Sequence, residues 1–282
     1  MIKGVIVIGA GTMGTGIAQV FASHGIRVFL NDISMDIVER SLKTIEKNLS
    51  RQVSKGKMTE EEMKKALSLI EFLPDIKEKK EVELVVEAAI EKMVVKKEIF
   101  ATLDTTYPEE VILASNTSSL PITEIASATS KPERVAGMHF FNPAPVIKLI
   151  EVIKGMRTSD EVIERIVEIS KFLGKEPVVV NDSPGFATSR FLMVMINEAI
   201  CGLWENVATA EGIDTAMKLG MNHPMGPLEL ADLIGLDVCL NIMEFLYESF
   251  KDPRYRPCPL LKKMVAAGFL GKKSGRGFYR YE

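Results

Sequence analysis

The sequence predicts an α/β protein: a Rossmann-type, mostly parallel sheet with a helical hairpin insertion, followed by an all-α C-terminal domain. Two observations support this fold class. Continuous apolar runs, typical of strands buried on both faces, alternate with helical periodicity in the first part of the chain, and only helical periodicity follows. The first apolar run also leads directly into a glycine-rich motif that opens a helix.

The glycine-rich motif is G-x-G-x-x-G, formed by Gly9, Gly11 and Gly14, with Thr12 and Met13 between the last two. In a dinucleotide site the first glycine makes a tight turn, the second lets the backbone approach a pyrophosphate, and the third lets the helix pack closely on the strand. The N-terminus of the helix then offers free N–H groups and a positive dipole end to the phosphates. The alternative is that the glycines serve packing alone.

An acidic residue, Asp32, follows the second apolar run, about 20 residues after Gly11. A carboxylate at this distance typically binds the adenosine ribose hydroxyls and favours NAD over NADP. Its alternative role is to cap the helix that starts near Ser34. Because strand, motif, helix and second strand occur in the order that the motif requires, we favour a dinucleotide site and expect NAD as the cofactor.

Composition excludes several classes of protein. The 282 residues, 46% of them hydrophobic, suffice for two domains with sizeable cores. A net charge of −3 does not indicate nucleic acid or a membrane surface as a partner, and no apolar run reaches transmembrane length. Three dispersed cysteines and three histidines form no metal-ligand pattern and fit a reducing compartment. We therefore expect a cytoplasmic protein with no signal peptide and no metal site.

Residues 34–70 predict the helical hairpin. Apolar positions recur at three- and four-residue steps over a long first helix, a glycine interrupts them, and a capping box starts a second helix. The simplest interpretation of the cations near the turn is a solvated face. These cations are Arg51, Lys55 and Lys57.

The strand–helix alternation resumes with apolar runs at 84–87 and 111–115. In parallel sheets, ligands bind beyond the carboxyl ends of the strands. We therefore expect residues 87–91 and the polar turn 116–119 at the mouth of the site, beside the glycine loop.

Two strand-like runs, 135–141 and 146–153, are joined by a short proline-containing segment and predict a β-hairpin. In a hairpin symmetric about Pro145, His139 and Glu151 fall opposite each other. A facing carboxylate can hold one imidazole tautomer and stabilise the imidazolium, as a general base requires. An exposed cross-strand pair is the alternative, and the residues alone leave both interpretations open.

A cluster of chain breakers at 181–185 divides the chain into predicted domains 1–183 and 184–282. The second domain is predicted to contain only helices. They are apolar enough to need more partner surface than a bundle of about 100 residues offers, so we expect a homodimer through this half. Its predicted helices are 186–207, 213–219, 227–250 and 260–267.

Five short blocks carry a resemblance that extends over essentially the whole chain: Gly9–Gly14, Ser115–Ser119, His139–Pro143, Asn222–Pro227 and Gly271–Phe278. Together they resemble the 3-hydroxyacyl-CoA dehydrogenases, most closely the short bacterial members that act on 3-hydroxybutyryl-CoA. The resemblance implies reversible hydride transfer between NAD and C3 of a short-chain (S)-3-hydroxyacyl-CoA, which yields the 3-ketoacyl-CoA.

The resemblance also implies roles for single residues. His139 is expected to be the general base and Glu151 its orienting carboxylate. Ser118 is expected to bind the substrate oxygen, and Asn142 to help place nicotinamide and substrate. The implied cofactor-binding residues are Gly9, Gly11, Thr12, Met13, Gly14, Asp32, Glu91, Lys96, Ser118, Asn142 and Lys273.

Coenzyme A meets this family at the helical hairpin, so the resemblance favours Arg51 and Lys55 as partners of its phosphates and leaves Lys57 ambiguous. The family usually reads Pro-Gly-Phe-x-x-Asn-Arg at the start of the helical domain, whereas this chain has Ser189 in place of the asparagine. Serine is shorter and has a single donor, so we expect a substrate contact there with altered geometry.

Two other functions are compatible with part of the sequence. One is a related NAD-dependent dehydrogenase of a hydroxyacid without CoA. The other is a nucleotide-binding protein that has lost turnover, against which the retained residues argue. Those residues are Ser118, His139, Asn142 and Glu151.

Overall fold

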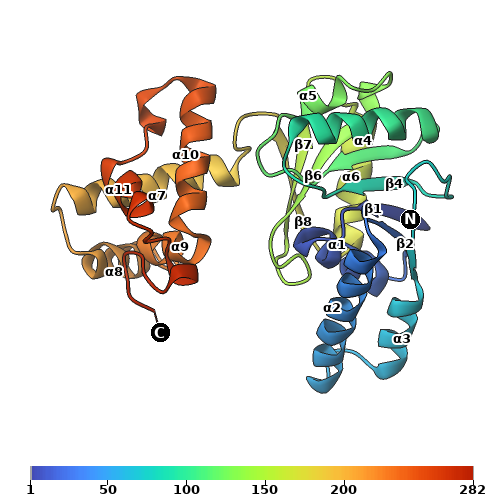
Figure 1. Ribbon diagram of the computed structural model, residues 1–282, viewed down its shortest axis with the longest axis horizontal. Coiled ribbons are helices and arrows are strands. Elements are labelled where there is room, and N and C mark those ends of the chain that lie inside the picture. The colour runs from blue at the N-terminus through green and yellow to red at the C-terminus, as the bar shows by residue number, and fades with distance from the viewer. Residues whose placement is uncertain (1, 282) are drawn as a thin grey trace. The chain divides into compact units, whose positions relative to one another are not determined.

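One eight-stranded sheet organises the N-terminal part of the chain, in the order β3-β2-β1-β4-β5-β6-β7-β8 (Figure 1). Neighbouring strands are parallel except β6 and β7, which are antiparallel, so the predicted mostly parallel sheet is confirmed. The strands are β1 (Gly4–Ile8), β2 (Arg27–Asn31), β3 (Ile70–Phe72), β4 (Leu84–Glu87), β5 (Ile112–Ser115), β6 (Val135–Phe140), β7 (Leu149–Lys154) and β8 (Glu176–Asn181).

The structure, a computed structural model, describes residues 2–281. The chain divides into two units, Met1–Asp182 and Ser183–Glu282, one residue from the boundary that we place after residue 183 on the basis of the sequence.

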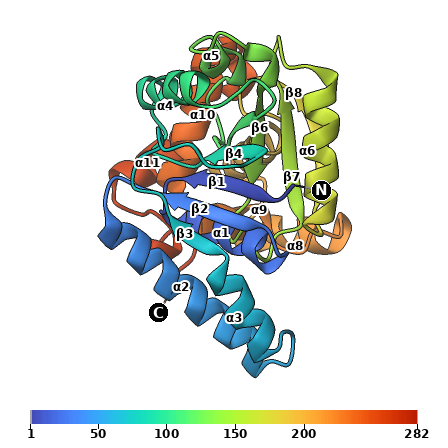
Figure 2. The ribbon, with the colours of Figure 1, turned by 90° about the vertical axis from the view of Figure 1, so that its right-hand side faces the viewer.

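Helices cover both faces of the sheet, with α1 and α6 on one face and α4 and α5 on the other (Figures 1 and 2). The predicted hairpin insertion is the α2–α3 pair, which projects beyond the sheet in Figure 2. The helices of this unit are α1 (Thr12–Ser23), α2 (Met35–Ser54), α3 (Glu60–Ser68), α4 (Met93–Thr106), α5 (Ile122–Ala126), the 3-10 turn η1 (Pro132–Arg134) and α6 (Asp160–Phe172).

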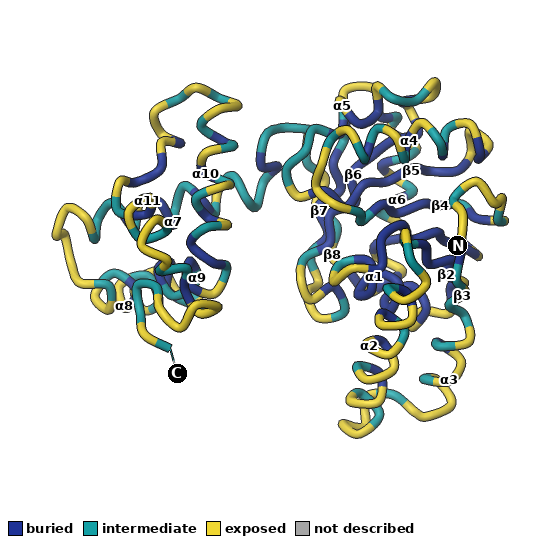
Figure 3. The backbone as a smooth tube through the Cα atoms, in the orientation of Figure 1, coloured by how far each residue is buried: buried dark blue, intermediate teal, exposed yellow. Residues whose placement is uncertain are grey.

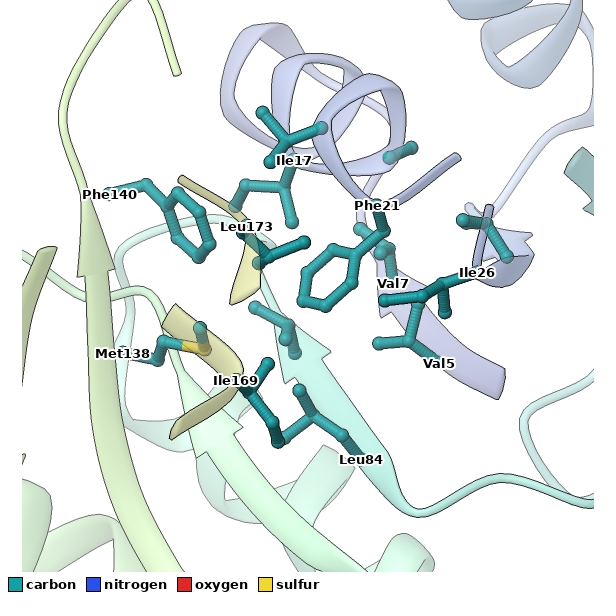
Figure 4. Close-up of a cluster of buried hydrophobic side chains, with 14 of the residues drawn as sticks. Val5, Val7, Ile17, Phe21, Ile26, Leu84, Met138, Phe140, Ile169 and Leu173 are labelled. Carbon is teal, nitrogen blue, oxygen red and sulfur yellow. The ribbon is translucent and has the colours of Figure 1, made fainter. Parts of the chain in front are cut away.

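The core on the α1 face joins the glycine-motif helix to the strand that carries His139. Figure 4 shows side chains of α1, β1, β6 and α6 meeting there. The rings of Phe21 and Phe140 are 6.4 Å apart between centroids. Because side chains alternate along a strand, the packing of Phe140 into this core turns His139 to the opposite face of the sheet. The central strands are buried along their length, whereas the tip of the α2–α3 pair is exposed (Figure 3).

The hairpin between β6 and β7 has the predicted register but a longer connection. His139 pairs with Glu151, as predicted. However, β7 begins at Leu149 rather than at residue 146, because residues 143–147 form a turn in which the N–H groups of Val146 and Ile147 both donate to the Pro143 carbonyl. Proline lacks the N–H that a strand ladder needs, which explains the late start of β7.

The C-terminal unit contains only helices and short bridges, as predicted for the second domain. One predicted helix, 227–250, is wrong: Gly235 has φ +105° and separates α9 from α10. A glycine tolerates this left-handed conformation, and it ends the first helix there. The helices are α7 (Thr188–Trp204), α8 (Ala210–Gly220), α9 (Pro227–Ile234), α10 (Leu236–Phe250), η2 (Pro253–Tyr255), α11 (Pro259–Ala266) and η3 (Lys272–Ser274).

Two buried aspartates hold this unit together. The Asp214 carboxylate accepts the N–H groups of Leu228 and Glu229 at 2.9 Å and so caps α9. The Asp232 carboxylate accepts the N–H groups of Phe278 at 3.0 Å and Tyr279 at 2.9 Å. Each carboxylate supplies acceptors to backbone donors that would otherwise be buried without a partner.

Two glycines of the nucleotide motif make a matched pair for a stability test. A Cβ on Gly14 would lie 1.6 Å from the Gly9 carbonyl oxygen, whereas a Cβ on Gly11 would meet nothing within 4 Å. We expect Gly14→Ala to lower the free energy of unfolding by more than about 3 kcal/mol, because the clashing atom belongs to the backbone. Gly11→Ala should change it by less than about 1 kcal/mol. Urea unfolding measures both, and equal stability of the two variants would contradict the close approach of α1 to β1.

Candidate active site

A buried histidine–carboxylate pair lies at the centre of the site. His139 Nδ1 is 2.9 Å from Glu151 Oε2, and the two residues are only 6% and 1% exposed. This burial excludes the exposed cross-strand pair that the sequence left open. An ionised carboxylate can only accept, so Nδ1 carries the proton and the basic lone pair of a neutral ring is on Nε2. An arrangement of this kind can orient an imidazole for general-base chemistry.

A pocket of about 340 Å³ opens beside His139. Phe141, whose ring centroid is 4.3 Å from that of His139, forms part of its wall. Six residues that the sequence analysis singled out line this pocket together: Met13, Glu91, Lys96, Ser118, His139 and Asn142.

A lysine and two glutamates form a charge network at the carboxyl end of β4. The Lys96 ammonium is 1% exposed and lies 2.7 Å from Glu87 Oε1 and 3.2 Å from Glu91 Oε2. The fully buried Glu87 also accepts a 2.6 Å hydrogen bond from the Ser115 hydroxyl. The sequence predicts Glu87 at the mouth of the site, within residues 87–91, but predicts no role for it; the signal for such a role is an acid at the end of an otherwise apolar buried strand.

Glu91 organises the polar turn after β5. Its carboxylate accepts hydrogen bonds from the Thr117 hydroxyl, from the Ser118 N–H at 3.0 Å and from the Ser119 hydroxyl at 3.3 Å. Burial raises the pKa of the Glu91 carboxyl, but the charge of Lys96 and these hydrogen bonds outweigh burial and hold the pKa below its usual value. Glu91 is therefore ionised at neutral pH and holds the turn that carries the exposed Ser118.

Asn116 lies in the polar turn 116–119 that the sequence predicts at the mouth of the site, but the sequence predicts no role for it. Its Oδ1 accepts a 2.8 Å hydrogen bond from the backbone N–H of Phe140, the residue after His139. Asn116 thus ties the end of β5 to the part of β6 that presents the histidine. Its position directly after a buried strand predicts this location but not the hydrogen bond to β6.

A larger pocket, of about 680 Å³, lies at the carboxyl ends of β1 and β2 and contains Gly9, Gly11 and Asp32. The Asp32 carboxylate accepts the N–H of Ala10 at 2.6 Å and the N–H of Ile33 at 2.8 Å. It does not cap α2, because the Ser34 hydroxyl does so. Much of the remaining wall is apolar, as a flat purine ring requires: Ile8, Ile33, Ile37, Ile76, Ile90, Val95 and Ile99.

A third pocket, of about 490 Å³, adjoins the start of α1 and is lined by Gly11, Thr12 and Asn142 among others. A side chain on Gly11 would meet no protein atom within 4 Å, so the backbone there is open to a close ligand. The first-turn N–H groups of α1 have no acceptor within their own helix. Open space, unpaired donors and the carboxylate of Asp32 fit the phosphates and ribose of a dinucleotide.

Of the hairpin cations, Arg51 lies in the last turn of α2, Lys55 is its C-cap residue, and the exposed Lys57 follows in the turn. Arg51 and Lys55 are exposed, and Arg51 lines a groove of about 440 Å³ together with Lys43 and Lys47. The cations at positions 43, 47, 51 and 55 follow one another at four-residue spacing, so they project from the same side of the helix. This concentration of positive charge suits a phosphate-bearing ligand.

Two predicted residues belong to the C-terminal unit. The Lys273 ammonium donates to Asp237 Oδ2 at 2.7 Å, and this hydrogen bond lowers the pKa of Asp237. Ser189 lies in the first turn of α7 and is partly exposed. Their roles toward cofactor and substrate stay predictions.

Residues 2–281 contain neither a metal-ligand cluster nor a membrane-spanning helix. No group of three or more His, Cys, Asp or Glu in this range could hold a metal ion. No helix in it combines the length and apolar character needed to cross a membrane.

Comparison with known proteins covers almost the whole chain. Family models describe residues 4–183 as a 3-hydroxyacyl-CoA dehydrogenase NAD binding domain and residues 185–281 as a 3-hydroxyacyl-CoA dehydrogenase C-terminal domain. The chain is 54% identical to a probable 3-hydroxybutyryl-CoA dehydrogenase of Bacillus subtilis, over 100% of this chain and 98% of that protein. It is 52% identical to the 3-hydroxybutyryl-CoA dehydrogenase of Bradyrhizobium diazoefficiens, over 100% and 96% of the two. The crystal structure of (S)-3-hydroxybutyryl-CoA dehydrogenase from Ralstonia eutropha superposes with a TM-score of 0.97 at 48% identity, with both chains covered completely.

The lowered pKa of Glu91 predicts a pH-dependent contribution to stability. A glutamate in the unfolded chain titrates near pH 4.3. Because the folded pKa is lower, the carboxylate stabilises the fold fully above that pH and loses its effect as the pH falls through the folded pKa. We expect Glu91→Gln to cost about 1 kcal/mol at pH 7, a modest value because the side chain is 39% exposed, and much less near pH 3.

Urea unfolding of the wild type and the variant at both pH values measures this difference. Glu98→Gln, on the exposed face of α4, is the control and should change stability little at either pH. A Glu91→Gln effect that is equally large at pH 3 and pH 7 would show that the charge of Glu91 is not responsible.

Proposed function

Because the chain belongs to the 3-hydroxyacyl-CoA dehydrogenase family, we propose that His139 is the general base of an NAD-dependent interconversion of (S)-3-hydroxybutyryl-CoA and acetoacetyl-CoA. The chain is an NAD-dependent oxidoreductase, and the three relatives compared above, each matched over at least 96% of its length, are named 3-hydroxybutyryl-CoA dehydrogenase or probable 3-hydroxybutyryl-CoA dehydrogenase. The observation that carries the catalytic assignment is the buried His139–Glu151 pair, whose histidine lines a pocket together with Ser118 and Asn142.

The tautomer of His139 determines which ring nitrogen exchanges a proton with the substrate. In the direction of oxidation Nε2 takes the proton of the 3-hydroxyl, and the ring becomes an imidazolium that the Glu151 carboxylate stabilises through Nδ1. In the direction of reduction the imidazolium returns this proton to the carbonyl oxygen. NAD, when bound, supplies the chemistry of hydride exchange with C3. A positioned base of this kind contributes roughly 10²–10⁴ to the rate.

Ser118 and Asn142 are proposed to orient the reacting groups. The Ser118 hydroxyl can donate to the substrate oxygen, and its turn is held by Glu91. Asn142 lines both the His139 pocket and the pocket at the start of α1, so its amide can contact substrate and cofactor at once. Two oriented donors near the substrate oxygen favour the geometry in which His139 Nε2 reaches the proton of the 3-hydroxyl.

The cofactor is proposed to lie along the glycine motif, with the α1 N-terminus on its diphosphate. The Asp32 oxygens each accept one backbone N–H and keep lone pairs for the adenosine ribose hydroxyls. The same carboxylate repels a 2′-phosphate, which favours NAD over NADP. Glu91, Lys96 and Lys273 are proposed as further cofactor contacts.

The substrate carries a coenzyme A whose phosphates are proposed to meet Arg51 and Lys55. Ser189 is proposed to contact the acyl part. Both assignments rest on the resemblance, and the assignment of Arg51 and Lys55 is supported as well by the neighbouring cations of α2. We propose neither nucleic acid nor a membrane as a partner.

The proposal includes a homodimeric assembly and a cytoplasmic location. A homodimer through the C-terminal unit is supported by apolar side chains that this unit exposes, among them Phe191 at 70% and Leu219 at 82%. A cytoplasmic location is supported by the cysteines Cys201, Cys239 and Cys258, which are all unpaired.

Oxidation of NADH that depends on acetoacetyl-CoA tests the proposed substrate. We expect activity with acetoacetyl-CoA, far less with free acetoacetate, and a kcat/KM that is higher with NADH than with NADPH. Preference for the free acid would instead favour the hydroxyacid dehydrogenase without CoA. Binding of NADH without turnover of either substrate would favour a nucleotide-binding protein.

His139→Gln tests the catalytic assignment. Loss of the base should lower kcat for acetoacetyl-CoA at least about a hundredfold. Glu151→Gln should cause a smaller but clear loss, because it removes the charge that stabilises the imidazolium. The control is His24→Gln, since His24 is exposed and its ring Nδ1 bonds only within α1, to the Val20 carbonyl. Near-normal turnover of His139→Gln would remove His139 from the mechanism.

A further inference from the structure

A buried lysine outside the proposed mechanism lies just before β8. Lys175 is 7% exposed, and its ammonium donates to the carbonyl of Ala144 at 2.6 Å and to that of Ile147 at 2.8 Å. Both hydrogen bonds that this ammonium makes within residues 2–281 go to the main chain. The buried Lys96, in contrast, is paired with glutamates. Burial lowers the pKa of Lys175, as expected for a desolvated ammonium.

The two carbonyls belong to the turn that separates β6 from β7. Within this turn the N–H groups of Val146 and Ile147 donate to the Pro143 carbonyl at 2.9 and 3.0 Å, which makes a single helical turn. A cation that binds carbonyls near the end of such a turn completes its hydrogen bonding and opposes its dipole. The chain next to Lys175 is also bonded directly after the turn, because the N–H of Glu176 donates to the Lys148 carbonyl at 2.8 Å.

The turn also forms part of the site. A Cβ built on Gly16 of α1 would lie 3.1 Å from Ala144 Cβ and 3.3 Å from Pro145 Cδ, so the turn packs directly on the glycine-motif helix. Residues 142–145 line the pocket at the start of α1, and Asn142 lines the His139 pocket as well. A shift of the turn therefore changes both pockets together.

We propose that Lys175 is a positioning residue for the reaction: its ammonium fixes the 143–147 turn against α1 and thereby sets the position of Asn142 between the two pockets. A lysine suits this role because one nitrogen carries three donors and can satisfy two carbonyls of different residues. An apolar side chain of similar length leaves two carbonyls without their donor inside the protein, and the turn then relaxes. The inference rests on the proposed function, in which Asn142 orients substrate and cofactor.

The test compares three variants in the acetoacetyl-CoA assay. Lys175→Met removes the donors at nearly constant length, and we expect kcat to fall at least tenfold in protein that is folded at the assay temperature. Lys175→Arg keeps donors but places them differently, and we expect it to recover part of the loss. Lys171→Met, an exposed lysine at the end of α6, is the control and should keep kcat within twofold of the wild type.

A double-mutant cycle separates positioning from stability. If Lys175 acts through Asn142, Asn142→Ala should lower kcat much less in the Lys175→Met background than in the wild type. A purely structural lysine would lower the melting temperature and leave the two effects on kcat multiplicative. Wild-type kcat in folded Lys175→Met, or multiplicative effects, would overturn the inference.

Two further outcomes are also decisive. If Lys175→Met does not fold, Lys175→Arg replaces it: a kcat several-fold below the wild type supports positioning, and an unchanged kcat assigns Lys175 to stability alone. A wild type that is inactive with acetoacetyl-CoA would contradict the proposed function. In that case, fluorescence titration with NADH tests whether Lys175 fixes the 143–147 turn at the cofactor pocket. A dissociation constant for NADH that is unchanged in Lys175→Met would overturn the inference as well.

Discussion

The antiparallel pairing of β6 with β7 determines where the reactive groups lie. A shift of this pairing by one residue would move Glu151 to the other face of the sheet and leave His139 without its carboxylate. Two packing constraints oppose such a shift. Phe140 is held in the core against Phe21, and a Cβ on Gly137 would lie only 2.7 Å from the side chain of its cross-strand partner Ile153. Packing on both faces of the sheet thus fixes the position of the histidine–carboxylate pair.

The parallel part of the sheet supplies the remainder of the site. Because β1, β4 and β5 run in the same direction, the segments that follow them meet at one edge, and these are the glycine motif, residues 87–91 and residues 116–119. Where these segments meet, polar groups need hydrogen-bond partners. The Lys96 ammonium binds the carboxylates of Glu87 and Glu91, and the Glu91 carboxylate in turn accepts the N–H of Ser118, so residues 87–91 and 116–119 are connected. The network that stabilises this edge of the sheet therefore contains residues that we propose as cofactor contacts.

Much of this arrangement could be predicted from the sequence, because periodicity reports which face of an element is buried. The alternation of apolar runs with helical periodicity predicted the sheet, and the spacing of the glycines predicted the nucleotide motif. A hairpin symmetric about Pro145 predicted that His139 lies opposite Glu151. Choices between partners that are distant in sequence could not be predicted. Nothing in the spacing indicates that Lys96 pairs with the buried Glu87, that Asp237 binds Lys273, or that Lys175 reaches the carbonyls of a turn about 30 residues earlier. Such contacts depend on how whole elements pack in three dimensions.

The tautomer of His139 tests the central claim most directly, because the proposed chemistry requires a proton on Nδ1 and a basic Nε2. A long-range ¹H–¹⁵N NMR spectrum of the neutral rings reports this, and with three histidines in the chain the His139→Gln spectrum identifies the relevant signals. We expect His139 to be protonated on Nδ1, with a downfield proton resonance typical of a hydrogen bond to a carboxylate that Glu151→Gln removes. A His139 ring protonated on Nε2, with no effect of Glu151→Gln, would contradict the account.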